Sequence, residues 1–230
     1  MNKFFELPIF GVFITLLAFY IAGTVKQRYK FILLNPVLVA IALIITFLVA
    51  FDLDFEDYNQ GGQYLGFFLG PSVVALGVLF YEKYRQIQHN LVPFLAAVCI
   101  GGVFSIVNVV LICVFMNAPD MIIKSIAPKS ITTPMAVEVS EIVGGVPSIT
   151  AGVVIAVGIF GNAFGPAILR FLNITSQAAI GAALGTAAHG IGTARALEDG
   201  ELTGAYSGLA LCVNGVLTSI ITPLAIRYLM

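Results

Sequence analysis

IAPKSITTPMAVEVSE, residues 126–141, is a polar run that contains two prolines in an otherwise apolar sequence. A second run of this kind, residues 189–201, reads HGIGTARALEDGE. A gapless overlay matches Ile131 with Ile191, Thr133 with Thr193, Ala136 with Ala196, Glu138 with Glu198, Glu141 with Glu201 and Gly144 with Gly204. Small residues often match by chance, but two glutamates in register are harder to dismiss in a chain with few charges. We interpret the two stretches as related halves of one site.

The composition is that of a membrane protein. Of the 230 residues, 59% are hydrophobic and 10% are charged, whereas soluble domains are about 45–50% apolar and about 25% charged. A helix needs about 20 apolar residues to cross a bilayer, so the length predicts an all-α polytopic membrane protein with roughly seven or eight hydrophobic segments. We expect one integral membrane domain, residues 1–230, whose function lies within the bilayer.

Several classes of function are disfavoured by the same composition. The net charge is −1, and no basic cluster is dense enough for nucleic acid. The three cysteines, Cys99, Cys113 and Cys212, lie in apolar runs without metal-ligand spacing, so we expect no metal site, no disulfide framework and no cofactor. We also expect no enzymatic activity, and a serine hydrolase in particular is disfavoured because a Gly-x-Ser-x-Gly motif is absent. An intramembrane protease that uses Ser130 and Lys129 is disfavoured, since adjacent helical residues do not face each other.

Three blocks of the chain share one pattern, a plain apolar helix followed by an interrupted one. The blocks are residues 35–82, 92–141 and 148–201. LGPSVVALGV at 69–78 overlays IAPKSITTPM at 126–135, and the same offset carries Pro36 onto Pro93. Internal repeats with segments interrupted by glycine or proline are typical of the binding sites of transporters.

The interrupted stretches either cross the membrane or turn back halfway, and the sequence leaves both possibilities open. Irregular backbone at membrane depth is tolerated only where protein or a water-filled cavity receives its polar groups. Both possibilities therefore predict a cavity, and we expect two or more interrupted or re-entrant helices.

The first stretch combines an ammonium group with hydroxyl groups. We expect a helix to begin at Pro128 and to present the side chains of Lys129, Ser130, Thr132 and Thr133 together with free backbone amides. A helix N-terminus carries roughly half a positive charge and unsatisfied donors, so this arrangement predicts an anion site. The alternative is that Lys129 extends to the surface and caps a neighbouring helix.

The second stretch supplies the other candidate binding residues. They are His189, Gly190, Gly192, Thr193 and Arg195. The glycines predict a break in the helix near His189, and Arg195 offers a two-donor fork for a carboxylate. A charged side chain near membrane depth is by default a functional candidate.

Glu138 and Glu198, one of the two glutamate pairs in register, are candidates for coupling or for ion pairing. Either one could carry a proton during transport, or could simply neutralise Arg195. The sequence favours neither of these roles.

Four stretches closely resemble the LrgB/CidB family of bacterial membrane proteins. They are IAPKSITTPMAVEVSEIVGGVPSIT (126–150), ALGTAAHGIGTARALEDGELTGAYSGLA (183–210), LGPSVVALGVLFYE (69–82) and LNPVLVAIALI (34–44). The resemblance covers nearly the whole chain and its motifs are specific. Two departures are small: Ala188 replaces the usual serine before the histidine, and Leu79 stands where proline is frequent.

The resemblance implies two different functions. The family has been described as antiholin-like and tied to murein hydrolase export and autolysis, while members are also linked to transport of small monocarboxylates such as pyruvate. A plant plastid relative exchanges glycolate and glycerate. We therefore expect a secondary transporter of the pyruvate, lactate or glycolate class in the bacterial inner membrane, with a holin- or antiholin-like protein as the alternative. The expected partners are the carboxylate, H⁺ or Na⁺, the lipid bilayer, a smaller LrgA/CidA-type membrane protein and further copies of the chain.

Overall fold

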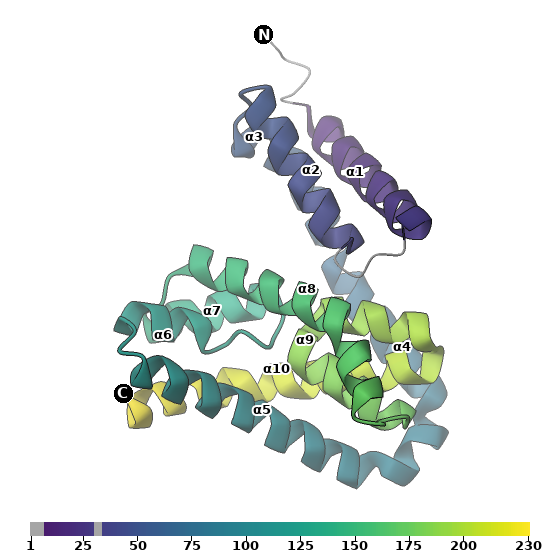
Figure 1. Ribbon diagram of the computed structural model, residues 1–230, viewed down its shortest axis with the longest axis vertical. Helices are drawn as coiled ribbons and strands as arrows, with labels where there is room; N and C mark the ends of the chain where they lie inside the picture. Colours follow the sequence, from purple (N-terminus) through teal and green to yellow (C-terminus); the bar gives the residue numbers. More distant parts are fainter. Residues whose placement is uncertain (1–6, 30–33) are drawn as a thin grey trace. The chain divides into compact units, whose positions relative to one another are not determined.

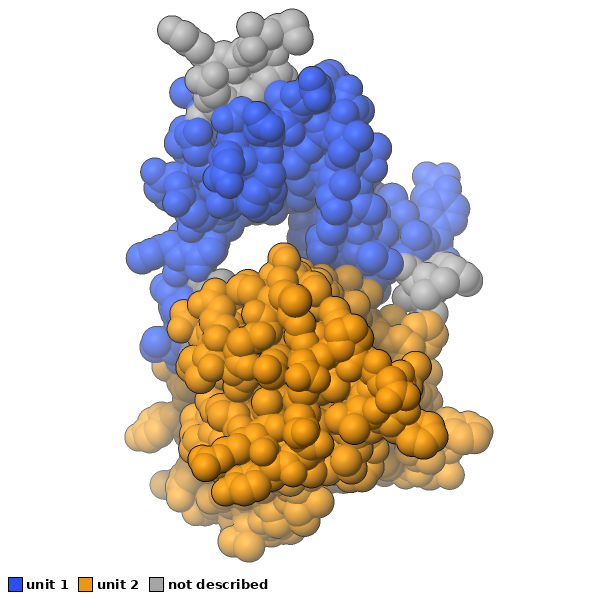
Figure 2. Space-filling model, turned by 90° about the vertical axis from the view of Figure 1, so that its left-hand side faces the viewer, with its two compact units in different colours: residues 1–75 blue, residues 76–230 orange. Residues whose placement is uncertain are grey.

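The computed structural model describes residues 7–29 and 34–230, and every regular element within them is a helix (Figure 1). The prediction of an all-α fold is therefore confirmed. The chain forms two compact units, residues 1–75 and 76–230, which are coloured separately in Figure 2. The expectation of one membrane domain stays a prediction, and each unit is described by itself below.

The first unit is a small helical assembly. It contains α1 (Pro8–Tyr29), α2 (Pro36–Ala50), α3 (Phe55–Phe67) and the start of α4 (Leu69–Ile87). Asn35 caps α2, because its Oδ1 atom accepts a hydrogen bond of 2.8 Å from the amide of Val37, and Pro36 follows at the first helical position. Gly11 on α1 and Gly61 on α3 allow the two backbones to touch, since a Cβ atom on Gly11 would lie 2.9 Å from the Cα atom of Gly61.

The second unit is built around its last helix. It contains the rest of α4, the short η1 (Gln88–Asn90), α5 (Leu91–Phe115), α6 (Asp120–Ile126), α7 (Thr133–Val143), α8 (Pro147–Phe171), α9 (Gln177–Asp199) and α10 (Glu201–Leu229). α10 packs against α9, α5 and α7. α5 and α10 run side by side in the same direction (Figure 1), because Phe94 contacts Tyr206 near their beginnings and Val110 clusters with Ile226 near their ends.

The hydropathy of these helices is that of a multi-pass membrane protein. Four helical stretches of the described chain are long and apolar enough to cross a membrane, namely Pro8–Tyr29, Phe55–Phe115, Pro147–Phe171 and Glu201–Leu229. α2 is a shorter apolar helix. Large apolar side chains such as Phe115 and Phe171 are exposed to 88% and 85%, which suits side chains that face lipid rather than water.

The first interrupted stretch turns back on itself. Residues 127–132, between α6 and α7, form turns rather than a helix. The amide of Val146, just after α7, donates a hydrogen bond of 2.7 Å to Ser125 Oγ, near the end of α6. α7 has 11 residues, and at about 1.5 Å per residue it reaches only about half of the ~30 Å hydrocarbon core. This stretch therefore enters and returns instead of crossing.

The helix start that we predicted at Pro128 is wrong. α7 begins at Thr133, and Pro134 occupies its first turn, where a fixed φ and a missing N–H cost nothing. Lys129 and Ser130 lie before this helix, in the turns of residues 127–132. The predicted combination of a helix N-terminus with these side chains is therefore not formed.

The second interrupted stretch doubles back within α9. The backbone leaves helical geometry at Ala188 and at His189, whose φ of 42° is rare for a residue other than glycine. A Cβ atom on Gly192 would overlap the carbonyl oxygen of Leu184, although in a continuous helix these residues would be about 12 Å apart. α9 is therefore a helical hairpin, and neither of its arms is long enough to cross alone.

The order of elements can be compared with the three blocks. An uninterrupted helix, α2, α5 or α8, stands near the start of each block. Each is followed by a break in helical structure, at Phe68, at residues 127–132 and at residues 188–189 respectively. The repeat relationship between the blocks stays a prediction.

Candidate functional site

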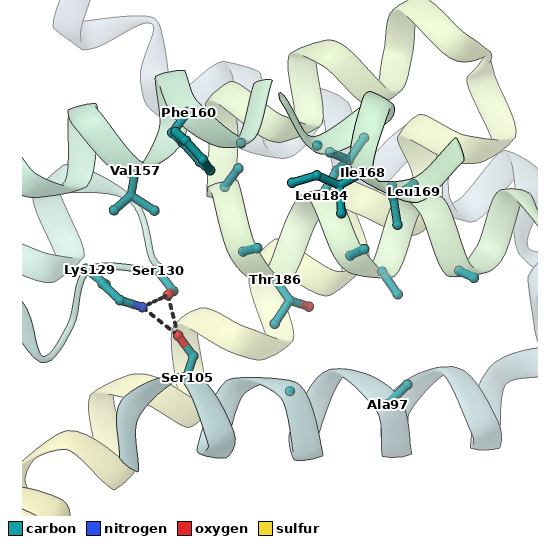
Figure 3. A pocket seen from close by; sticks show the side chains of 18 residues that line it. Ala97, Ser105, Lys129, Ser130, Val157, Phe160, Ile168, Leu169, Leu184 and Thr186 are labelled. Atoms are coloured by element: carbon teal, nitrogen blue, oxygen red, sulfur yellow. Dashed lines mark hydrogen bonds between the residues drawn. The ribbon is translucent and has the colours of Figure 1, made fainter. Parts of the chain in front are cut away.

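A cavity of about 610 Å³ lies inside the second unit (Figure 3). Residues of α5, α8, the first arm of α9 and the turns between α6 and α7 line it. Its wall is mostly apolar, with Val157, Phe160 and Ile168 among its larger side chains. The polar residues of its lining are Ser105, Lys129, Ser130 and Thr186.

Lys129 and two serines form a polar cluster at one end of the cavity (Figure 3). Lys129 Nζ donates to Ser105 Oγ at 2.8 Å and to Ser130 Oγ at 3.3 Å, and the two hydroxyl oxygens are 2.8 Å apart. No carboxylate of residues 7–29 and 34–230 lies within ion-pair distance of Lys129. A partly buried ammonium group without a counter-charge is costly. The cluster therefore favours an anion in the cavity.

Ser105 is a site residue that the sequence analysis missed. It is the only serine of α5, a helix that otherwise consists almost entirely of apolar residues. A lone hydroxyl group in the middle of an apolar membrane helix is the signal that could have identified it. Its partner Lys129 could not be deduced from spacing, because the two residues lie on separate elements.

Asn214, in the middle of α10, joins the two interrupted stretches. Its Nδ2 atom donates to the carbonyl oxygen of Ser130 at 3.1 Å and to that of Thr186 at 3.0 Å. The segments around both breaks also reach the same cavity, the first through Lys129 and Ser130 and the second through Thr186 and Ala188, which precede the paired residues 189–201. The break between α6 and α7 and the break within α9 are therefore neighbours in the fold, while a shared site formed by residues 126–141 and 189–201 stays a prediction.

The sequence matches a known protein family over most of its length. The model of the LrgB-like family matches residues 15–228. The chain belongs to the LrgB family. The resemblance noted from the motifs is thereby confirmed.

Three similar proteins match over almost their whole length. The antiholin-like protein LrgB of Bacillus mycoides (strain KBAB4) is 32% identical over 96% of this chain and 97% of its own. The uncharacterized protein YwbG of Bacillus subtilis (strain 168) is 31% identical over 96% and 98%. An uncharacterized protein of Haemophilus influenzae is 31% identical over 94% and 93%. No solved structure is a significant match to the chain.

In this LrgB-family chain, several residues of the second motif hold the α9 hairpin together. The ring of His189 is 4% exposed, and its Nε2 atom lies 3.0 Å from the carbonyl oxygen of Val154 on α8. Thr193 Oγ1 donates to the carbonyl oxygen of His189 at 2.9 Å and lies 2.9 Å from Ser207 Oγ on α10. Gly192 permits the close approach of Leu184. These contacts place the arms of the hairpin, and none of these three motif residues lines the cavity.

The remaining hydroxyls and the glycine of the two motifs lie near the site but outside the cavity lining. Thr132 and Thr133 are half-buried at the start of α7, and Gly190 is half-buried just after the break in α9. The lining residues do not include them. Their roles in substrate binding stay predictions.

The charged candidates lie away from the Lys129 cluster. Arg195 Nη1 is 2.9 Å from Asp199 Oδ1 and 3.2 Å from Glu198 Oε2, so its guanidinium pairs with its own helix. Glu138 is exposed on α7. None of these side chains lines the cavity. Substrate binding by Arg195, and coupling by Glu138 or Glu198, stay predictions.

Proposed function

We propose that this chain is a secondary transporter of a small monocarboxylate, of the pyruvate, lactate or glycolate class, across the bacterial inner membrane. The observation that carries the proposal is the Lys129 ammonium group, which faces a largely apolar cavity with two hydroxyls beside it and without a carboxylate partner in the described chain. An anion that enters the cavity supplies the missing charge.

The rest of the cavity wall favours a small anion with a single charge. One carboxylate neutralises Lys129 and accepts hydrogen bonds from the ammonium group and from the Ser105 and Ser130 hydroxyls. A second carboxylate would face Val157 and Phe160, where it would lose hydration without gaining a partner. The apolar wall accommodates the short hydrocarbon part of the substrate instead.

The re-entrant architecture supports transport rather than a static binding site. Carriers built from internal repeats place their substrate where interrupted helices meet near the middle of the membrane. In this chain two hairpins with short arms meet at Asn214 beside the cavity. We propose that H⁺ or Na⁺ is coupled to the carboxylate, that no cofactor is involved and that the protein is not an enzyme.

The second candidate function is that of an antiholin-like protein. The observation in its favour is the name of relatives such as the antiholin-like protein LrgB of Bacillus mycoides. A pore-forming assembly needs several copies and a lumen, and we propose further copies of the chain and a smaller LrgA/CidA-type protein as its partners. Such an assembly does not require one unpaired lysine in a cavity, which is why transport is the leading proposal.

Uptake into proteoliposomes that contain this chain alone tests the proposal. Labelled pyruvate, lactate and glycolate are offered to the wild type and to Lys129→Met. Lys129 is the one cation among the described lining residues, and its loss costs roughly 2–5 kcal/mol, or at least about thirtyfold in apparent affinity. Lys124→Met is the matched control, because Lys124 lies on α6 outside the cavity lining.

The expected result is uptake by the wild type and by Lys124→Met, with strongly weakened uptake by Lys129→Met. Absence of uptake of all three acids by the wild type would contradict transport by this chain alone. Unchanged uptake by Lys129→Met would contradict the role of the Lys129 cluster.

A further inference from the structure

The buried side-chain oxygens that lack a hydrogen-bond partner all lie in one region of the described chain. In residues 7–29 and 34–230 they are Thr186 Oγ1, Asn214 Oδ1, Thr218 Oγ1 and Thr222 Oγ1. Asn214 Nδ2 bonds the carbonyl oxygen of Thr186, so these two residues are in contact. Asn214, Thr218 and Thr222, hereafter the polar row, follow one another at intervals of one turn along α10.

The polar row is difficult to explain by packing. All three residues are at most 1% exposed, and a buried polar group without a partner destabilises the folded state. Threonine and serine in membrane helices commonly donate to the carbonyl four residues earlier. Ser219 does this with Gly215 at 2.9 Å, whereas Thr218 and Thr222 on the same helix do not. Valine would fill the same space without the unsatisfied hydroxyl.

The polar row starts beside the cavity and ends one helical turn before an apolar cluster. At its beginning, Asn214 holds Ser130, whose hydroxyl lines the cavity. One turn beyond Thr222 lies Ile226, which packs with Val110, Ile123 and Ala127; we call these four residues the plug.

A second hollow lies on the other side of the plug. It has a volume of about 270 Å³, and Asn117, Asp120, Ile123 and Met230 are among its lining residues. Ile123 belongs to both the plug and the lining of this hollow. From the cavity to the end of α10, the order is therefore polar row, plug and polar-lined hollow. Apolar constrictions of this kind block a path by excluding water.

We propose that the polar row lines the closed half of the transport path, between the Lys129 cavity and the hollow at the end of α10. When the plug separates, water and the transported solute reach the three side-chain oxygens and satisfy them. This inference rests on the proposed transport function, but it assigns further path-lining residues outside the anion site. It also identifies the end of the molecule at which the cavity opens in the alternate state.

Cysteine labelling tests water access to the polar row without depending on the solute. In the full chain with Cys99, Cys113 and Cys212 replaced by alanine, Thr218→Cys and Thr222→Cys are treated with a membrane-impermeant sulfonate methanethiosulfonate. Ile220→Cys is the matched control, because Ile220 lies between Thr218 and Thr222 on α10 but is 59% exposed on the outer surface of the helix, where an apolar side chain suits lipid. The reagent attacks only thiolates, which form in water and not in lipid.

We expect both row cysteines to react at least about tenfold faster than Ile220→Cys, from the membrane face at which α10 ends, because only they contact water. Equal rates at all three positions would overturn the proposal. If the row cysteines react in a protein that takes up none of the three carboxylates, the result supports the path along the polar row and refutes only the proposed substrate class.

Valine substitutions provide the second arm of the test and preserve the shape of the side chains. Thr218→Val and Thr222→Val remove unsatisfied hydroxyls, so their thermal midpoints in detergent should equal or exceed that of the wild type. Uptake should fall at least about tenfold per folded molecule, because an apolar row cannot hold water. Lower stability with unchanged uptake would show that the hydroxyls serve the folded structure only and would overturn the proposal.

Discussion

The Nδ2 atom of Asn214 lies 3.1 Å from the carbonyl oxygen of Ser130, although the two residues belong to different elements. The same atom lies 3.0 Å from the carbonyl oxygen of Thr186. Both carbonyls stand next to breaks in helical structure, where the regular donor four residues later is lost. Asn214 therefore satisfies one carbonyl group freed by each break and holds the two breaks beside one cavity.

Replacement of Asn214 by leucine should destabilise the second unit. Asn214→Leu leaves two buried carbonyl oxygens without a donor, and we expect a loss of roughly 2–4 kcal/mol in the free energy of unfolding. The measurement is the thermal unfolding of purified protein in detergent. Ser219→Ala is the control, because the Ser219 hydroxyl bonds only within its own helix. Equal midpoints for the two variants would contradict the role assigned to Asn214.

Two glycines of the second motif should respond differently to alanine. In Gly192→Ala the new Cβ would overlap the Leu184 carbonyl and lie 2.7 Å from the Ala188 Cβ atom, so the hairpin cannot close without movement of the backbone. Such overpacking costs about 1–3 kcal/mol, occasionally more. A Cβ on Gly190 meets nothing within 4 Å, so Gly190→Ala should be neutral or slightly stabilising. The thermal midpoint in detergent should therefore be lower for Gly192→Ala than for Gly190→Ala. An equal decrease in both variants would contradict the close approach of Gly192 to Leu184 in α9.

The contact between α8 and the α9 break can be tested from the α8 side. In Gly158→Ala, the Cβ would lie 2.8 Å from both Cε1 and Nε2 of His189, which pushes the ring away from the Val154 carbonyl. We expect a lower thermal midpoint and a loss of about 1–3 kcal/mol. Gly152→Ala on the same helix is the control, because nothing lies within 4 Å of its Cβ. If Gly158→Ala were as stable as Gly152→Ala, His189 would not be fixed in this way.

The two interpretations of Arg195 predict different effects on uptake. Its pairing with Glu198 and Asp199 is partly exposed, and such pairs contribute about 0–1 kcal/mol. If the pairing is only structural, Arg195 does not contact the substrate, and we expect Arg195→Leu to change the apparent affinity for carboxylate by less than about fivefold.

If Arg195 is instead a substrate ligand, the loss should reach at least about thirtyfold, and Arg195→Lys should restore it only in part. The double variant Arg195→Leu with Glu198→Gln separates the two cases, because the affinity should stay near normal where the pair is only structural and should remain at least about thirtyfold weaker where Arg195 binds the substrate. Normal affinity in this double variant would exclude Arg195 as a ligand.

The residues alone were sufficient for the features that depend on local chemistry. The excess of apolar side chains identified a membrane protein, because charged and polar surface is needed in water and excluded from lipid. The start of α2 is local chemistry of this kind, since the Asn35 cap and the fixed φ of Pro36 act within three residues. The prolines and glycines marked both interrupted stretches, because these residues disrupt helical hydrogen bonding wherever they occur.

Tertiary contacts decided which residues form the cavity cluster. Lys129 donates a hydrogen bond to Ser105 of α5, and Asn214 of α10 donates to a carbonyl group beside each break. These residues are far apart in the chain, so no local sequence pattern encodes their contacts. The guanidinium group of Arg195 is suited to bind a carboxylate ligand. In the fold, however, it pairs with Glu198 and Asp199 at the end of its own helix. Packing also decided whether each interrupted stretch crosses or turns back. The glycines around His189 are compatible with a sharp turn and with a crossing helix. The contact of Gly192 with Leu184 and the positive φ of His189 show that the chain turns back.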